Sequence, residues 1–308
     1  MTENGVHTDP AALDELAEAA RHEQTEVGEN GGVAGYKPGR TLRLSVELRR
    51  QFRRRRTQLV LGFVVLLPFI LVAAFEIGQS SPNRRSGGFV DLATASAPNF
   101  VVLGLFVASG FLLPTIVALF FGDTIASEAS WSSLKYLLAI PVPRHRVLRQ
   151  KAIVSGLLSI LALVLLPVVS LVVGLLWYGA GDAISPTGDA IGFGQSLLVL
   201  AVSTVYLVVQ LAWVAGLALL LSVSTDAPLG AVGGAVLAAI LSQILDQITA
   251  LGSLRNYLPT HYSSAWIDLF STDIDWTNIA AGVLSAVIYA TVLTLLAARR
   301  FATKDITS

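Results

Sequence analysis

The sequence predicts an all-α integral membrane protein with six transmembrane helices, an amphipathic interface helix before the first of them, and both termini in the cytoplasm. Of the 308 residues, 54% are hydrophobic and only 14% are charged, whereas about a quarter of the residues in a soluble domain are charged. The charges are also gathered in a few segments, which leaves long stretches without any. This composition excludes a soluble enzyme, a nucleic-acid-binding protein and a disordered scaffold as first interpretations.

Six apolar runs reach the length of about 20 residues that a helix needs to cross the hydrocarbon core. Each run is expected to be helical, because unpaired backbone groups in hydrocarbon are costly. Pro68, Pro114 and Pro167 lie within three of the runs, and each predicts a kink. The expected spans are residues 58–77, 100–121, 152–177, 196–222, 229–250 and 279–298.

The orientation follows from lysine and arginine, which favour the cytoplasmic side of a membrane. Residues 1–57 carry ten of them, residues 122–151 carry five and the tail after residue 298 carries three. The three segments on the other side carry only three in total. We therefore expect a multi-pass protein of the cell membrane with both termini inside.

The chain is expected to divide into three parts. Residues 1–40 are polar, acidic and glycine-containing, and they predict a flexible cytoplasmic tail rather than a signal peptide. Residues 41–302 form the six-span domain, and residues 303–308 form a short cytoplasmic tail.

An amphipathic helix is expected immediately before the first span. Leu44, Leu48 and Phe52 recur every four residues along one face, and arginines that include Arg49 and Arg53 cover the rest. Such a helix lies in the headgroup layer, where its basic side chains contact anionic lipid. It either serves only as this anchor or also contacts a cytoplasmic partner, and its sequence leaves both interpretations open.

The second connection, from Gly122 to Lys151, is much longer than a turn between two spans requires. It carries Glu128 and then leucines at helical spacing, Pro141 and Pro143 stop the helix, and a basic run follows. The pattern predicts a compact cytoplasmic helix rigidly joined to two spans. Motion imposed on such a corner would be transmitted to the spans.

This connection resembles the cytoplasmic segment of ABC-2-type transporter permeases, the membrane subunits of ATP-driven exporters, which reads approximately E-x-E-x-G-T-L-x-x-L-L-x-x-P-V-S-R. The sequence departs from that pattern at Ser130, at Ser132-Ser133 and at Pro143. With the basic interface helix and the six spans, the likeness covers about residues 42–302. The positions that match are Glu128, Leu134, Leu137, Leu138, Pro141, Val142 and Arg144, followed by Leu148 and Lys151.

The resemblance implies two permease halves around a translocation route, with one ATPase subunit under each. The second half is either another copy of this chain or a sister permease. ATP and Mg²⁺ belong to the ATPase, because the chain has no nucleotide-binding signature, and the chain itself is expected to be neither an enzyme nor a cofactor protein. The expected coupling residues are Glu128, Leu134, Leu137, Leu138, Pro141 and Arg144. Replacing Glu128 or Arg144 is expected to spare insertion and abundance, since both lie outside the hydrocarbon.

Polar residues inside two spans have two interpretations. They either form interhelical hydrogen bonds or line a substrate route, since buried polar groups in membranes usually face protein or water. The candidate route residues are Tyr206, Gln210 and Trp213 in the fourth span, and Gln243, Asp246 and Gln247 in the fifth.

The segment from Leu251 to Asn278 is too polar to span and too long for a turn. The resemblance implies short re-entrant or interfacial helices here, on the outer side. Trp266 and Trp276 are placed as interfacial anchors. His261 is expected to be solvated or interfacial rather than paired with Asp268 in a catalytic or metal site.

The leading functional interpretation is a permease that exports a hydrophobic or amphipathic substrate, such as a lipid, a drug or a peptide antibiotic. An intramembrane protease or lipid hydrolase is an alternative, but the sequence lacks H-E-x-x-H, G-x-S-x-G and any histidine inside a span. An ion-coupled transporter is a further alternative, and it would need charged residues near mid-bilayer. No cysteine is present and four histidines are scattered, so no metal site is expected.

Overall fold

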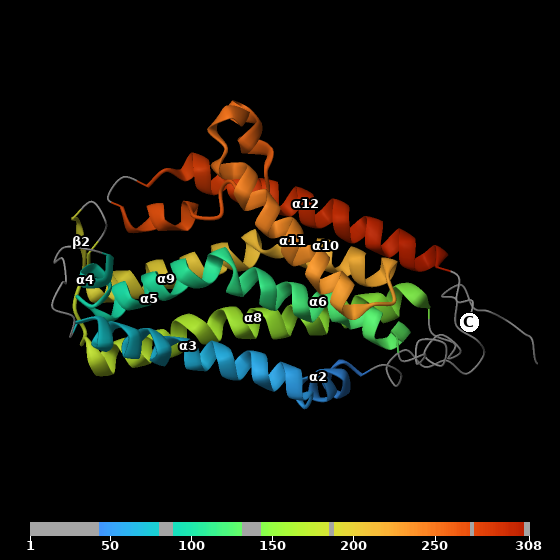
Figure 1. Cartoon of the computed structure of the whole chain (residues 1–308), viewed down its shortest axis with the longest axis horizontal. Coiled ribbons are helices and arrows are strands. Elements are labelled where there is room, and N and C mark those ends of the chain that lie inside the picture. Colours follow the sequence, from blue (N-terminus) through green and yellow to red (C-terminus); the bar gives the residue numbers. More distant parts are fainter. Residues whose placement is uncertain (1–42, 80–88, 131–142, 185–187, 272–273, 305–308) are drawn as a thin grey trace, which may run out of the picture.

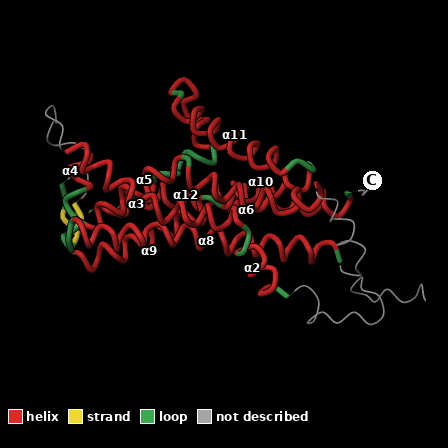
Figure 2. The backbone as a smooth tube through the Cα atoms, turned by 60° about the horizontal axis from the view of Figure 1, so that its bottom comes forward, coloured by secondary structure: helices red, strands yellow, loops and turns green. Residues whose placement is uncertain are grey.

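The computed structural model describes residues 43–79, 89–130, 143–184, 188–271 and 274–304. These residues form an elongated bundle of helices (Figure 1). One end holds helix α2 (Leu44–Phe52), the start of α8 (Arg144–Trp177) and the end of α12 (Trp276–Thr303), and we call it the basic end. The opposite end holds α4 (Phe89–Ala93) and the antiparallel pair β1 (Ala183–Ile184) and β2 (Ala190–Ile191), and we call it the hairpin end (Figure 2).

Six helical stretches in the described part of the chain are long and apolar enough to cross a membrane, which confirms the predicted all-α, six-span fold. The cytoplasmic location of both termini stays a prediction. Several extend beyond the predicted spans, because a helix continues to satisfy its own backbone outside the hydrocarbon. The 34-residue α8, about 51 Å long, begins eight residues before the predicted third span. The six stretches are α3 (Arg55–Gln79), α6 (Leu112–Ser130), α8, α9 with α10 (Phe193–Gln210 and Ala212–Ser224), α11 (Pro228–Gln247) and α12.

The predicted second span is two helices, α5 (Ala97–Gly110) and α6, which are separated at Phe111. Phe111 has a non-helical backbone with φ −137° and ψ −50°. Pro114 explains the break, because it has no N–H and its ring would clash with the carbonyl of Gly110, four residues earlier. The kink predicted at Pro114 is therefore a complete break, whereas α3 and α8 continue through Pro68 and Pro167.

Two 3₁₀ helices, η1 (Thr249–Tyr257) and η2 (Ala265–Phe270), form the segment between α11 and α12. Short helices were expected here, and they are present; their outer location stays a prediction. Figure 1 shows η1 standing out from the bundle beyond the end of α11. The anchoring role expected for Trp266 is wrong, because its side chain is fully buried in the core, whereas Trp276 is 63% exposed.

Close helix contacts occur at glycines. A Cβ atom at Gly122 of α6 would lie 2.9 Å from Cγ2 of Val232 in α11, and one at Gly216 of α10 would lie 3.1 Å from the carbonyl oxygen of Ala290 in α12. Small residues let membrane helices approach in this way. These contacts place α11 and α12 against the α6 and α10 helices.

Candidate functional site

A charged cluster at the basic end joins α2 and α3 to α6 and α8. It contains three acids and four bases, so its members nearly balance in charge. Acids are contributed mainly by α6, and bases mainly by the segment around α2. The cluster consists of Glu47, Arg50, Arg54, Arg56, Asp123, Glu128 and Lys151.

Glu128 of α6 and Lys151 of α8 form its centre. Their side chains are 8% and 5% exposed, and Nζ of Lys151 lies 2.6 Å from Oε1 of Glu128. Arg50 of α2 donates to the same oxygen over 3.0 Å. Buried charges of this kind need a partner, because desolvating an isolated charge is very costly. Replacing Glu128 would leave Lys151 buried without its closest anion, so a loss of stability and abundance is now expected, in contrast to the expectation from the sequence.

Glu47 extends the cluster along α2. Its Oε1 lies 2.8 Å from Arg50, 3.0 Å from the amide of Gln51 and 3.5 Å from Nζ of Lys151. Burial alone would raise the pKa of Glu47, but hydrogen bonds from Arg50 and Gln51 and the charges of Lys151 and Arg50 outweigh it. The pKa of Glu47 therefore lies below its ordinary value, and the carboxylate is ionised at neutral pH.

Asp123 forms the other acidic centre. It lies in α6, is 6% exposed and pairs with Arg54 over 3.4 Å and with Arg56 at the start of α3. The connection between α2 and α3 is thus fixed to α6 by charge. Loss of Asp123 would release the turn between the interface helix and the first span from α6.

Helix α2 has two faces with different surroundings. Glu47, Leu48 and Gln51 are turned toward the bundle, and Leu48 packs against the hydrophobic core. Leu44 and Phe52 are 39% and 46% exposed, and Arg49 and Arg53 are exposed as well. The predicted apolar stripe is therefore split, because only Leu48 contacts the core and the other two remain available to lipid.

Arg144 belongs to a second group of contacts at the basic end. Its guanidinium donates to the carbonyl oxygens of Ala302 and Lys304, over 3.1 and 2.9 Å, at the end of α12. Lys304 in turn pairs with Asp226, in the turn before α11, over 2.7 Å. The expected coupling residues between the two groups, Leu134, Leu137, Leu138 and Pro141, lie outside the described residues.

The polar side chains of the fourth span hold the segment between η1 and η2. The hydroxyl of Tyr206 donates to the carbonyl of Tyr262 over 2.6 Å. The side-chain amide of Gln210 donates to the carbonyl of Pro259 over 2.7 Å. Both side chains are buried, as is that of Trp213. Tyr206 and Gln210 therefore act as structural hydrogen-bond donors, and any lining of a route by them stays a prediction.

The polar side chains of α11 behave differently. Gln243 donates to the carbonyl of Gly110 over 2.6 Å, which satisfies the oxygen that Pro114 leaves without its helical donor. Asp246 pairs with Nδ1 of His261 over 2.5 Å, so the partner of this histidine is Asp246 and not Asp268. Gln247 is exposed.

Sequence reasoning missed Asp123, Glu47 and the buried role of Lys151. A usable signal was present, because an acid at the end of an apolar run and a basic residue beginning the next run predict a buried pair. Among the described residues, no group of three or more histidine, aspartate or glutamate side chains could hold a metal.

The fold and the cluster together define a multi-pass helical membrane protein whose interface helix is locked by ion pairs to the ends of its spans. Residues 44–224, more than half of the chain, match the ABC-2 family transporter protein family. The chain therefore belongs to the ABC-2 transporter family, as the resemblance of its second connection indicated. The match runs from α2 to α10 and includes every member of the charged cluster. No curated protein matches the sequence.

Proposed function

We propose that this chain is the permease subunit of an ATP-driven exporter in the cell membrane. A separate ATPase subunit supplies ATP, Mg²⁺ and hydrolysis, and the substrate is hydrophobic or amphipathic: a lipid, a drug or a peptide antibiotic. The observation that carries the proposal, beyond family membership, is how the second connection is held. Each of its flanks is fixed to a different part of the bundle at the basic end.

The flank at Glu128 is bound to α8 by a buried ion pair with Lys151, and to α2 by an ion pair with the half-exposed Arg50. Removing one partner of the buried pair costs about 3–5 kcal/mol, so α6 and α8 move together, and the Arg50 pair connects α2 to them. The flank at Arg144 is bound to the end of α12. An ATPase that docks on the connection would therefore act on the first three spans through one flank and on the last span through the other.

The break between α5 and α6 supports a route on this side of the bundle. Helix α5 has 14 residues, which places Phe111 about 21 Å from its far end. Asp123 lies twelve residues beyond Phe111 in the other direction, about 18 Å. The break is therefore near mid-bilayer, and Phe111 is 57% exposed there. Non-helical backbone at this depth must be covered by protein or line a water-filled cavity.

A second permease, either another copy of this chain or a sister chain, would cover this surface in the proposed assembly. Gln243 and Gly110 would then lie where the two halves meet, and Asp246 and Gln247 would lie one turn further along α11. The proposed complex has two permeases and two ATPase subunits. This arrangement accounts for the exposed side chain of Gln247 at a depth where lipid would not satisfy its amide.

Co-purification tests the proposal. The chain is expressed with an ATP-binding cassette protein encoded beside it, and the complex is reconstituted in liposomes. We expect a complex of two permeases and two ATPases whose hydrolysis is stimulated by a hydrophobic compound that it exports. A transport-competent complex with one permease copy would contradict the assembly, and failure to bind any such ATPase would contradict the function.

A further inference from the structure

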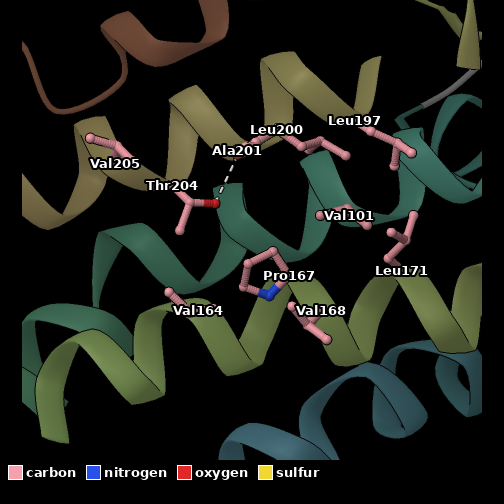
Figure 3. A pocket seen from close by; sticks show the side chains of 10 residues that line it. All are labelled: Val101, Val164, Pro167, Val168, Leu171, Leu197, Leu200, Ala201, Thr204 and Val205. Atoms are coloured by element: carbon pink, nitrogen blue, oxygen red, sulfur yellow. Dashed lines mark hydrogen bonds between the residues drawn. The ribbon is translucent and has the colours of Figure 1, made fainter. Parts of the chain in front are cut away.

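An apolar groove opens on the side of the bundle between α5, α8 and α9, and Figure 3 shows the side chains that line it. Its volume is about 340 Å³. We propose that it is a binding site for one acyl chain of a bilayer phospholipid. This inference rests on the membrane fold and does not depend on the exporter function.

The wall chemistry defines the ligand class. Thr204 carries the single polar side chain among the lining residues, and its hydroxyl donates to the carbonyl of Leu200 in its own helix over 2.8 Å. The side chains that line the groove therefore offer no free hydrogen-bond donor to a ligand, and the oxygen of Thr204 is their single acceptor. A headgroup, a sugar or an ion would lose its hydration without compensation there, whereas a hydrocarbon chain would not. The lining residues are Val101, Val164, Pro167, Val168, Leu171, Leu197, Leu200, Ala201, Thr204 and Val205.

The depth of the groove matches an acyl chain. Trp177 ends α8 at the hairpin end, where a tryptophan marks the membrane interface. Leu171 and Val164 lie six and thirteen residues before it, about 9 and 20 Å along the helix. The groove thus lies in the hydrocarbon of the leaflet on the side of the hairpin end, and its far end is near mid-bilayer.

The floor of the groove is buried and its rim is exposed, as a binding site for a lipid chain requires. Val101 and Leu200 are 0% and 5% exposed and form the floor. Val164, Val168 and Val205 are 42%, 52% and 63% exposed and form the rim. In the membrane the rim faces lipid, so the medium that fills the groove is hydrocarbon. A chain held there gains contact on three sides, while a chain elsewhere on the surface has contact on one.

The proposal is tested by counting the phospholipids that stay bound after purification in detergent, by native mass spectrometry. Ala201→Phe fills the groove, and Leu198→Phe adds the same ring to an exposed position of α9 outside it. We expect Ala201→Phe to lose one phospholipid per chain, and Leu198→Phe and Thr204→Val to retain it. Equal lipid counts in the two phenylalanine variants would overturn the proposal.

A second measurement does not depend on folding of a filled variant. The chain has no cysteine, so Ala201→Cys provides a unique thiol that an alkyl methanethiosulfonate modifies after purification. The attached chain should displace one phospholipid, and the same reagent at Leu198→Cys should displace none. If modification at Ala201→Cys instead dissociates an oligomer and leaves the lipid count unchanged, a second copy covers the groove and the proposal is wrong.

Discussion

At the basic end and around α11, polar side chains hold separate parts of the chain together, but the two regions use different chemistry. At the basic end, α2 is held by ion pairs among seven charged side chains. Around α11, neutral donors such as Tyr206, Gln210 and Gln243 satisfy backbone carbonyls, and the acid of this region, Asp246, pairs with His261. The difference follows from the solvent, because charges are tolerated near headgroups and water but are expensive in hydrocarbon.

The two regions also differ in what they fix. The ion pairs hold whole helices against each other, and the loss of one partner leaves a buried charge. The neutral bonds hold irregular backbone, namely the residues between η1 and η2 and the break at Phe111. Variants in the first region should therefore affect the stability of the bundle, and variants in the second should affect local order.

The largest effect is expected for Lys151→Met, which leaves Glu128 buried without its closest cation. The loss of stability should be about 3–5 kcal/mol, seen as reduced abundance and a lower thermal unfolding temperature in detergent. Arg149→Met, at an exposed position of the same helix, is the matched control and should change little. Combining Lys151→Met with Glu128→Gln should recover part of the loss. Equal stability of the two single variants would show that the cluster does not hold the helices.

The sequence predicted the membrane-spanning helices well but did not predict which side chains pair between them, and the reason is physical. The spans were predictable because hydrocarbon imposes helical structure on any long apolar run. The pairing of Glu128 with Arg50 was not, because these residues are 78 positions apart and meet only after α2 folds back on α6. The pairing of His261 with Asp246 likewise depends on the path of η1, for which the local sequence contains no signal.

A smaller effect is expected for Gln210→Leu. The carbonyl of Pro259 loses its donor, and interhelical hydrogen bonds of this kind contribute about 0.6–1.7 kcal/mol. Unfolding of the whole bundle should change little, while amide hydrogen exchange in residues 257–263 should accelerate. Gln247→Leu, at an exposed position, is the control and should leave exchange unchanged. Unaltered exchange in Gln210→Leu would mean that this bond does not order the segment.

The smallest effect is expected when the pH is lowered. It should change the stability contributed by the charged cluster and leave the contribution of the neutral hydrogen bonds unchanged. Burial would raise the pKa of Glu47, but its hydrogen bonds and the nearby cations bring it below the ordinary value of 4.5. A lowered pKa in the folded state gives stability that is fully present above the unfolded pKa and is lost as the pH falls through the folded pKa. The stability difference between wild type and Glu47→Gln should thus be constant from pH 7 to about pH 5 and should shrink below about pH 4.5. Thermal unfolding across this range measures it, and Gln210→Leu, which removes no charge, should show a difference from wild type that is independent of pH. A wild-type advantage over Glu47→Gln that grows in acid would contradict the ionised, paired state of Glu47.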